Sequence, residues 1–134
     1  MFNHTSTSRD QRQHPRVKVP AMYSLIRARV VGSNRYSWTG HIYDVSLGGV
    51  RFELDTPIEP GTQLEIRSML PGSGHTTFRA VGRVARLHSD ADEQGPAIMG
   101  LQFESFQSPM DRHRLEQYID ARAQAQQTAI RRAA

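Results

Sequence analysis

Two clusters of polar residues have the composition of a site for a small anionic ligand. Arg12 and Arg16 lie four positions apart near the N-terminus. Guanidinium groups bind phosphates and planar bases through paired N–H donors better than lysine does. The second cluster is Asp44-Val45-Ser46-Leu47-Gly48-Gly49, which combines a carboxylate acceptor, a hydroxyl that donates or accepts, and two glycines.

Each cluster also has a purely structural interpretation. The two arginines belong to a chain in which 17 residues are Lys or Arg, so their spacing can arise by chance and their charges can simply be solvated. Asp44 and Ser46 followed by glycines are also ordinary turn residues that bond the local backbone. Trp38 could stack on a base, but the face it shares with Tyr36 and Ile42 favours packing in the core. The sequence alone leaves these alternatives open.

The elements that must position the clusters are β-strands. Alternation of apolar and polar residues predicts six of them, at about 23–31, 36–45, 49–54, 63–70, 76–87 and 97–103. The third alternates most cleanly, with Val50, Phe52 and Leu54 on one face. The apolar phase of the fifth slips near Gly82, which indicates a bulge or a barrel corner.

A helix follows the strands. Ser108 suits an N-cap, Pro109 the first helical position and Asp111 the first turn. Leu115, with the apolar residues three and four positions later, forms a stripe that can pack on the sheet. We therefore predict a mostly β fold, a six-stranded antiparallel barrel. Its expected parts are a flexible basic N-terminal arm over 1–20, the barrel over 21–107, a C-terminal helix over 108–127 and a disordered tail over 128–134.

The distribution of charge argues against a nucleic-acid-binding module. The net charge is +4, but residues 1–20 and 121–134 each contribute +3, whereas residues 21–120 hold ten basic and twelve acidic side chains. A module that binds DNA or RNA would carry a basic stripe across its folded body. The positive charge instead lies in terminal segments that can close over a small anion.

Composition excludes several further classes. The chain has no cysteine, which rules out disulfides and thiolate metal sites, and its six histidines show no metal-ligand spacing. No apolar run reaches the roughly 18–20 residues of a membrane helix, and the polar N-terminus lacks a signal-peptide core. We expect a cytoplasmic protein without membrane insertion, metal or cofactor.

Taken together, the two clusters resemble the RxxxR and (D/N)xSxxG signature of the PilZ domain family. They occur in the same order, separated by one pair of predicted strands, and the segment Met99-Gly100-Leu101-Gln102-Phe103 is similar to the closing strand of that family. The resemblance covers about residues 9–120. It implies a PilZ-type barrel that binds cyclic di-GMP, is not an enzyme, and signals as a monomer to an effector protein that the sequence does not identify.

The resemblance also implies the ligand-binding residues, which are Arg12, Arg16, Asp44, Ser46, Gly48 and Gly49. Cyclic di-GMP presents two phosphates and two guanines. An arginine fork can bind guanine O6 and N7 together or pair with phosphate, and an ionised aspartate can accept from the opposite guanine edge. Ser46 can bond phosphate or base, and the two glycines permit positive φ and a close approach of the backbone. No residue is assigned a catalytic role.

One position departs from the family pattern. Many members carry a further arginine directly before the first motif arginine, where it favours a stacked ligand dimer, and this chain has Gln11 there. Arg9, two residues upstream, can substitute for that cation. Gln11 and Arg9 are therefore secondary candidates, and we expect one ligand per chain.

Two other functions compete with this interpretation. One is a PilZ-like adaptor that binds a partner protein without the nucleotide. The other is a small barrel that binds nucleic acid, which would need aromatic residues displayed among basic ones on a strand face. No nucleophile elbow or P-loop supports an enzyme. If the chain is a receptor for cyclic di-GMP, we expect residues 1–20 to be mobile in the free protein and to become ordered over the barrel when ligand binds.

Overall fold

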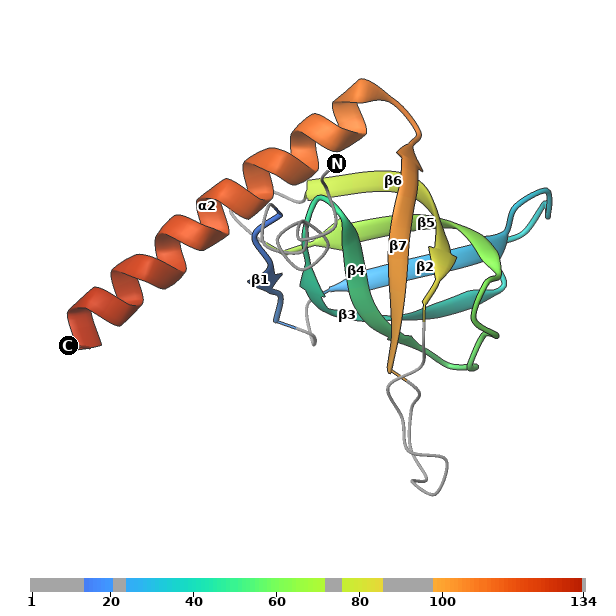
Figure 1. Cartoon of the computed structure of the whole chain (residues 1–134), viewed down its shortest axis with the longest axis horizontal. Coiled ribbons are helices and arrows are strands. Elements are labelled where there is room, and N and C mark those ends of the chain that lie inside the picture. The colour runs from blue at the N-terminus through green and yellow to red at the C-terminus, as the bar shows by residue number, and fades with distance from the viewer. Residues whose placement is uncertain (1–13, 21–23, 72–75, 86–97, 134) are drawn as a thin grey trace, which may run out of the picture.

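The computed structural model describes residues 14–20, 24–71, 76–85 and 98–133, with side chains to residue 126. These residues form seven β-strands and one long helix (Figure 1). The elements are β1 (Val17–Lys18), β2 (Leu25–Val30), β3 (Trp38–Val45), β4 (Gly49–Leu54), β5 (Gln63–Leu70), β6 (Thr76–Val84), β7 (Ile98–Phe106) and α2 (Pro109–Ala133).

Six of the strands close into an antiparallel barrel. The order β3-β2-β5-β6-β7-β4 returns to β3, because β4 pairs with both β7 and β3. Closure leaves these strands without an unpaired edge. The predicted six-stranded barrel is confirmed, and the structure adds β1 from the N-terminal segment, which pairs with the end of β3 through Val17↔Val45 and Lys18↔Asp44.

Strand positions predicted from alternation agree closely with the structure. The strands at 49–54 and 63–70 match β4 and β5, and the expected slip near Gly82 is a register shift between β6 and β7. A Cβ on Gly82 would lie 2.3 Å from the carbonyl oxygen of Gln102, so the two strands approach too closely there for a side chain. β7 continues to Phe106, three residues past its expected end. There the Phe106 ring meets that of Phe103 edge-on at 5.4 Å.

A second irregularity lies in β3. Ile42 pairs with Phe52, but the register then shifts, so that Asp44 pairs with Arg51 and Val45 with Val50. An extra residue in one strand reverses the faces of all residues that follow it. Without the shift, Asp44 would share the inner face of Ile42. With it, Asp44 lies on the outer face of the sheet opposite Arg51, although still buried, and Val45 enters the core.

The core fills the barrel and continues beneath the helix. Inward residues of the strands are almost fully buried, as the alternation in β4 and β5 predicts. Among the described side chains of the helix, the three of the predicted stripe, Leu115, Tyr118 and Ile119, are buried in this core, and Ala123 packs against it. Trp38 is partly buried and packs against the same cluster, in line with its structural interpretation.

The start of α2 is bound to the barrel by a buried carboxylate. Ser108 Oγ accepts from the Asp111 N–H at 3.3 Å and donates to Asp111 Oδ2 at 2.6 Å, which confirms the predicted cap. Asp111 Oδ1 accepts the backbone N–H of Arg79 in β6 at 2.8 Å. One side chain therefore joins the helix terminus to the sheet.

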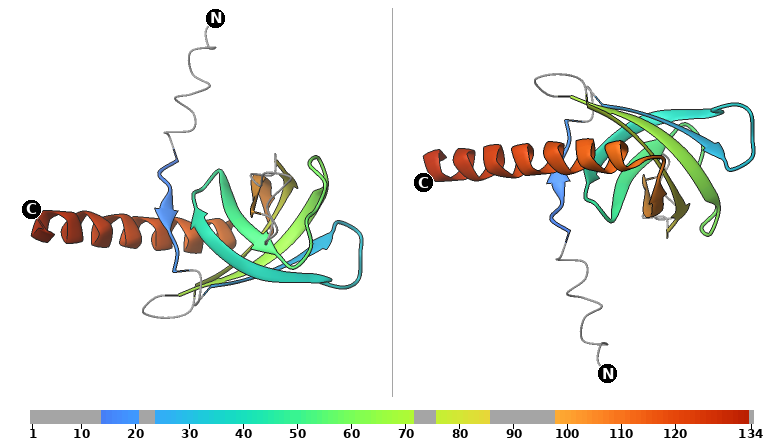
Figure 2. Two further views of the ribbon diagram at one scale, coloured as in Figure 1. Left: turned by 90° about the horizontal axis from the view of Figure 1, so that it is seen from below. Right: turned by 90° about the horizontal axis from the view of Figure 1, so that it is seen from above.

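The far end of α2 differs from the prediction. The helix continues through Ala133 instead of ending near residue 127, so most of the segment expected as a disordered tail is helical. Its final turns extend beyond the barrel (Figures 1 and 2). The segment is rich in alanine, glutamine and arginine, which favour helix without tertiary contacts. In the described part of the chain, no helix is long and apolar enough to span a bilayer.

Residues 14–20 lie between the barrel and α2. Val17 and Val19 are buried, the Val19 N–H donates to the Tyr43 carbonyl at 2.9 Å, and Arg122 and Gln126 of α2 both donate to the Lys18 carbonyl at 3.4 Å. Both views in Figure 2 place β1 across the helix. This part of the expected mobile arm is therefore packed, whereas residues 1–13 lie outside the described residues.

We predict that Asp111→Ala lowers the free energy of unfolding by about 1–3 kcal/mol, because it leaves the partly buried Arg79 N–H without its acceptor. Chemical denaturation measures the change. Asp120→Ala, on an exposed position of the same helix, is the control and should stay within about 0.5 kcal/mol of the parent. Equal stability of the two variants would contradict the role given to Asp111.

Candidate functional site

Asp44 is the centre of the candidate site. Its side chain is 8% exposed and carries an arginine on each oxygen. Arg16 pairs with Oδ1 through Nη1, and Arg51 Nε lies 2.9 Å from Oδ2. The two arginines are about half exposed, at 54% and 47%. A nearly buried carboxylate thus holds two solvent-facing cations side by side.

Three strands bring these groups together. The bulge in β3 turns Asp44 to the outer face, opposite Arg51 of β4, and residues directly opposite across strands interact most strongly. On the other side of β3, Lys18 of β1 pairs with Asp44 in the backbone register, and Arg16 directly precedes β1. The site is therefore assembled only when the N-terminal segment docks on the barrel.

The turn after β3 is held by Ser46. Its backbone N–H donates to the Gly49 carbonyl at 2.8 Å, and its hydroxyl accepts the Gly48 N–H at 3.1 Å. Ser46 is buried, so its hydroxyl serves the turn, as its structural interpretation predicts. The Gly48 carbonyl accepts from Phe103 of β7 at 2.9 Å, which ties the turn to the barrel.

Crowding requires glycine at position 49 and leaves little space at position 48. Gly48 and Gly49 permit positive φ but do not adopt it here, because the described glycines with positive φ are Gly32 and Gly61. A Cβ on Gly49 would lie 2.4 Å from the Leu101 carbonyl oxygen, too close for any side chain. A Cβ on Gly48 would come within 3.2 Å of the His14 ring, so the N-terminal segment covers the turn directly.

Tyr43, at the bulge, borders the site. Its hydroxyl donates to the Glu53 carboxylate, and this hydrogen bond, together with partial burial, raises the pKa of Tyr43 above its usual value. Its carbonyl accepts from Val19. The extra residue therefore binds β1 on one side and a β4 side chain on the other, which stabilises the bulge that orients Asp44.

Of the residues predicted from the sequence, the structure brings together Arg16, Asp44, Ser46, Gly48 and Gly49. Arg9, Gln11 and Arg12 lie outside the described residues. Arg51 was missed. The signal for it is its place just after the glycine pair, but matching it to Asp44 requires the register shift in β3, which alternation does not reveal.

The described part of the site can bind a ligand through hydrogen bonds and ionic interactions. Two guanidinium groups provide donor forks for an anion, and Asp44 provides an acceptor between them. Within the described ranges no group of three His, Cys, Asp or Glu side chains could hold a metal ion. The arrangement suits the binding of a small anion that also carries N–H donors.

The fold and the site define a small antiparallel barrel whose N-terminal segment crosses an Asp-Ser-Gly turn. Residues 10–121 match the family model for the PilZ domain. The chain therefore belongs to the PilZ domain family. No curated protein matches the sequence at a significant level.

Solved structures share the fold at low sequence identity. The inhibitor of motility MotI/DgrA of Bacillus subtilis is 19% identical, with a TM-score of 0.64. The match covers 84% of this chain and 51% of the MotI/DgrA chain. The PilZ domain of YcgR from Escherichia coli with c-di-GMP is 21% identical with a TM-score of 0.55, over 89% and 97%. YcgR in complex with c-di-GMP is 16% identical with a TM-score of 0.65, over 92% and 51%. This chain thus spans about half the length of MotI/DgrA and YcgR.

We predict that Gly49→Ala destabilises the protein by about 1–3 kcal/mol, because the added methyl group forces β4 and β7 apart. Thermal or chemical unfolding measures this. Gly100→Ala in β7 is the matched control, since its Cβ would make only an ordinary contact of 3.7 Å with Ala85. A Gly49→Ala protein as stable as the Gly100→Ala protein would refute the close approach at the turn.

Proposed function

We propose that this protein is a receptor for cyclic di-GMP that changes its surface on binding and signals to a partner protein. The observation that carries the proposal is the docking of Arg16 on Asp44 beside the Ser46–Gly49 turn in a member of the PilZ family. The structures of YcgR with c-di-GMP add support through their similar fold.

Arg16 and Arg12 supply the donor groups for the ligand. Arg16 is half exposed, so its guanidinium can turn to a guanine or a phosphate while β1, which follows it, stays paired with β3. Arg12 lies four residues earlier on the same segment and completes a pair of cations for the two phosphate charges. Gly48 gives the ligand access to the backbone once the His14 ring moves aside, and Gly49 lets the turn lie close against β7. Ser46 holds the turn in shape.

Asp44 changes partner when the ligand binds. In the free protein both of its oxygens are paired with arginines. When Arg16 moves to the ligand, Oδ1 becomes available to accept from the guanine edge, while Arg51 still holds Oδ2. Arg51 therefore orients Asp44 in both states, and this keeps a nearly buried carboxylate from being left without a cation.

The route for the signal is β1. Arg16 adjoins the two residues of β1, and the Lys18 carbonyl accepts from Arg122 and Gln126 of α2. A shift of Arg16 towards the ligand moves the strand that lies between the barrel and the helix. The partner would then recognise the altered surface of the N-terminal segment and α2, with no chemical reaction catalysed by this chain, which we place in the cytoplasm.

We predict that Arg12→Ala and Arg16→Ala each weaken binding of cyclic di-GMP by about five- to 150-fold. Losing one bidentate contact to guanine costs about 1–3 kcal/mol, and 1.4 kcal/mol is tenfold. Asp44→Ala should cause a loss of the same order. Isothermal titration calorimetry of the full chain measures the affinity, and the same titration gives the number of ligands per chain.

Arg35→Ala is the matched control, because Arg35 is an exposed arginine in the connection between β2 and β3. Its affinity should equal that of the parent. Circular dichroism confirms that each variant is folded. Unchanged affinity of the Arg16→Ala protein would reject this site. If the parent itself fails to bind, the PilZ-like adaptor that works without the nucleotide becomes the better assignment.

We also expect the ligand to increase amide protection in residues 8–18. Val19 is already bonded to Tyr43 in the free structure, so the gain should appear in the amides that precede it. Ligand contacts with Arg12 and Arg16 provide the differential affinity that such ordering needs. Hydrogen exchange with and without cyclic di-GMP measures this, with residues 64–70 of β5 as the internal reference. Equal protection in the two states would show that the segment is not the switch.

A further inference from the structure

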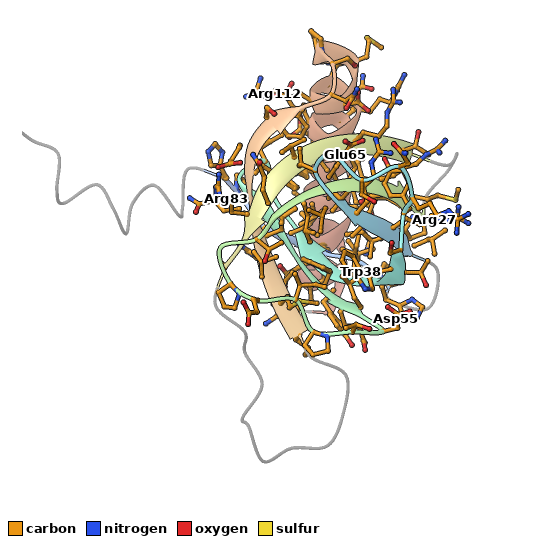
Figure 3. The ribbon with its side chains drawn as sticks, turned by 90° about the vertical axis from the view of Figure 1, so that its right-hand side faces the viewer. Arg27, Trp38, Asp55, Glu65, Arg83 and Arg112 are labelled. Atoms are coloured by element: carbon orange, nitrogen blue, oxygen red, sulfur yellow. The ribbon has the colours of Figure 1, made fainter. Side chains whose placement is uncertain are left out.

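A row of three arginines crosses the outer face of the barrel. Arg27 of β2 is directly opposite Arg67 of β5, and Arg67 is directly opposite Arg79 of β6. All three side chains are exposed. Strands lie about 4.8 Å apart in a sheet, so this arginine row is roughly 10 Å wide. Arg27 is visible on the barrel side that Figure 3 faces.

The charge of the arginine row is scarcely compensated. Arg27 and Arg67 have no ion pair within the described part of the chain, and Arg79 Nε lies 3.9 Å from Asp111 Oδ1. That oxygen also bonds the Arg79 backbone and lies 3.7 Å from Arg114. Like charges directly opposite one another destabilise a sheet. The arginine row therefore lowers the stability of the free protein.

The neighbouring row on the same face is neutralised. Arg29 of β2 is opposite Glu65 of β5, with Nη2 2.7 Å from Oε2. The Tyr36 hydroxyl donates to the same carboxylate at 2.9 Å, and the Arg29 guanidinium lies 4.6 Å from the Tyr36 ring centroid. Arg29 is therefore stabilised by a carboxylate and an aromatic ring. Arg27 and Arg67 in the arginine row have no such contacts among the described residues.

The row on the other side is partly apolar. Leu25, Met69 and Thr77 lie two residues along the same three strands, on the same outer face, and Met69 is 38% exposed. Arginine and methionine are enriched in protein interfaces relative to the rest of the surface. Methionine also adapts to partners of different shape. Arginines beside an exposed methionine and a partly exposed leucine are thus the composition of a protein-binding surface.

We propose that the arginine row is a docking surface for an acidic segment of a partner protein. Arginine forks pair bidentately with carboxylates, and two or three carboxylates of one segment fit the width of the row. A nucleic acid would need a longer basic track, whereas this one is bordered by Glu65 and by apolar residues. The surface is separate from Asp44 and does not depend on nucleotide binding.

The test uses the full-length protein and a short fluorescein-labelled peptide of alternating leucine and glutamate, followed by fluorescence anisotropy at low salt. We expect the peptide to bind, and Arg67→Gln to weaken binding about fivefold or more, the loss that about 1 kcal/mol produces. Arg83→Gln, which alters an exposed arginine paired with Glu104 at the other end of β6, should bind as the parent does. Cyclic di-GMP affinity should be unchanged in the Arg67→Gln protein.

A second variant separates docking from stability. Arg67→Glu places a carboxylate between Arg27 and Arg79, so we expect a higher Tm together with loss of peptide binding. Absence of peptide binding to the parent, full binding by Arg67→Gln, or a lower Tm for Arg67→Glu would each overturn the proposal. So would tighter, Arg67-dependent binding of a single-stranded oligonucleotide of equal charge, since it would assign the surface to nucleic acid.

Discussion

The register shift in β3 is the constraint on which the site depends. A strand that closes a barrel must send alternate residues inward, and Asp44 would fall on the inner face if the alternation from Ile42 continued. An ionised carboxylate there would be very costly. The extra residue at Tyr43 returns Val45 to the core and turns Asp44 outward to Arg51. The same local irregularity thus completes the core and creates the centre of the site.

Docking of the N-terminal segment connects that centre to the rest of the molecule. Val17 and Val19 are buried, and this apolar burial holds the otherwise polar segment 14–20 on the barrel. Tyr118 of α2 is also buried in the core, which raises the pKa of its hydroxyl, and among the described residues that hydroxyl has no hydrogen-bond partner. An unpaired polar group weakens an interface. The packing of α2 around Tyr118 is therefore weaker than its apolar burial alone would give.

The two basic regions of the folded body differ in physical character. At Asp44, a nearly buried carboxylate organises two arginines, and a ligand would have to compete for them. Across β2, β5 and β6, Arg27 and Arg67 face each other with no ion pair among the described residues, and Arg79 has only the long contact with Asp111. A partner would relieve their repulsion. A slightly acidic overall balance for residues 21–120 conceals this second region, because net charge does not show which side chains the strands place opposite one another.

Strand alternation, the turn residues of the Asp44 motif and the Ser108 cap are local properties, and the sequence by itself determined them because each depends on neighbours along the chain. The barrel class followed from the number and spacing of those strands. Only the tertiary structure decided which residues face one another. The β3 shift that pairs Arg51 with Asp44, the short β1, the crowding at Gly49 and the alignment of Arg27, Arg67 and Arg79 all arise from contacts between distant segments. Alternation is the same in any register, so the register itself can be set only when the strands pack.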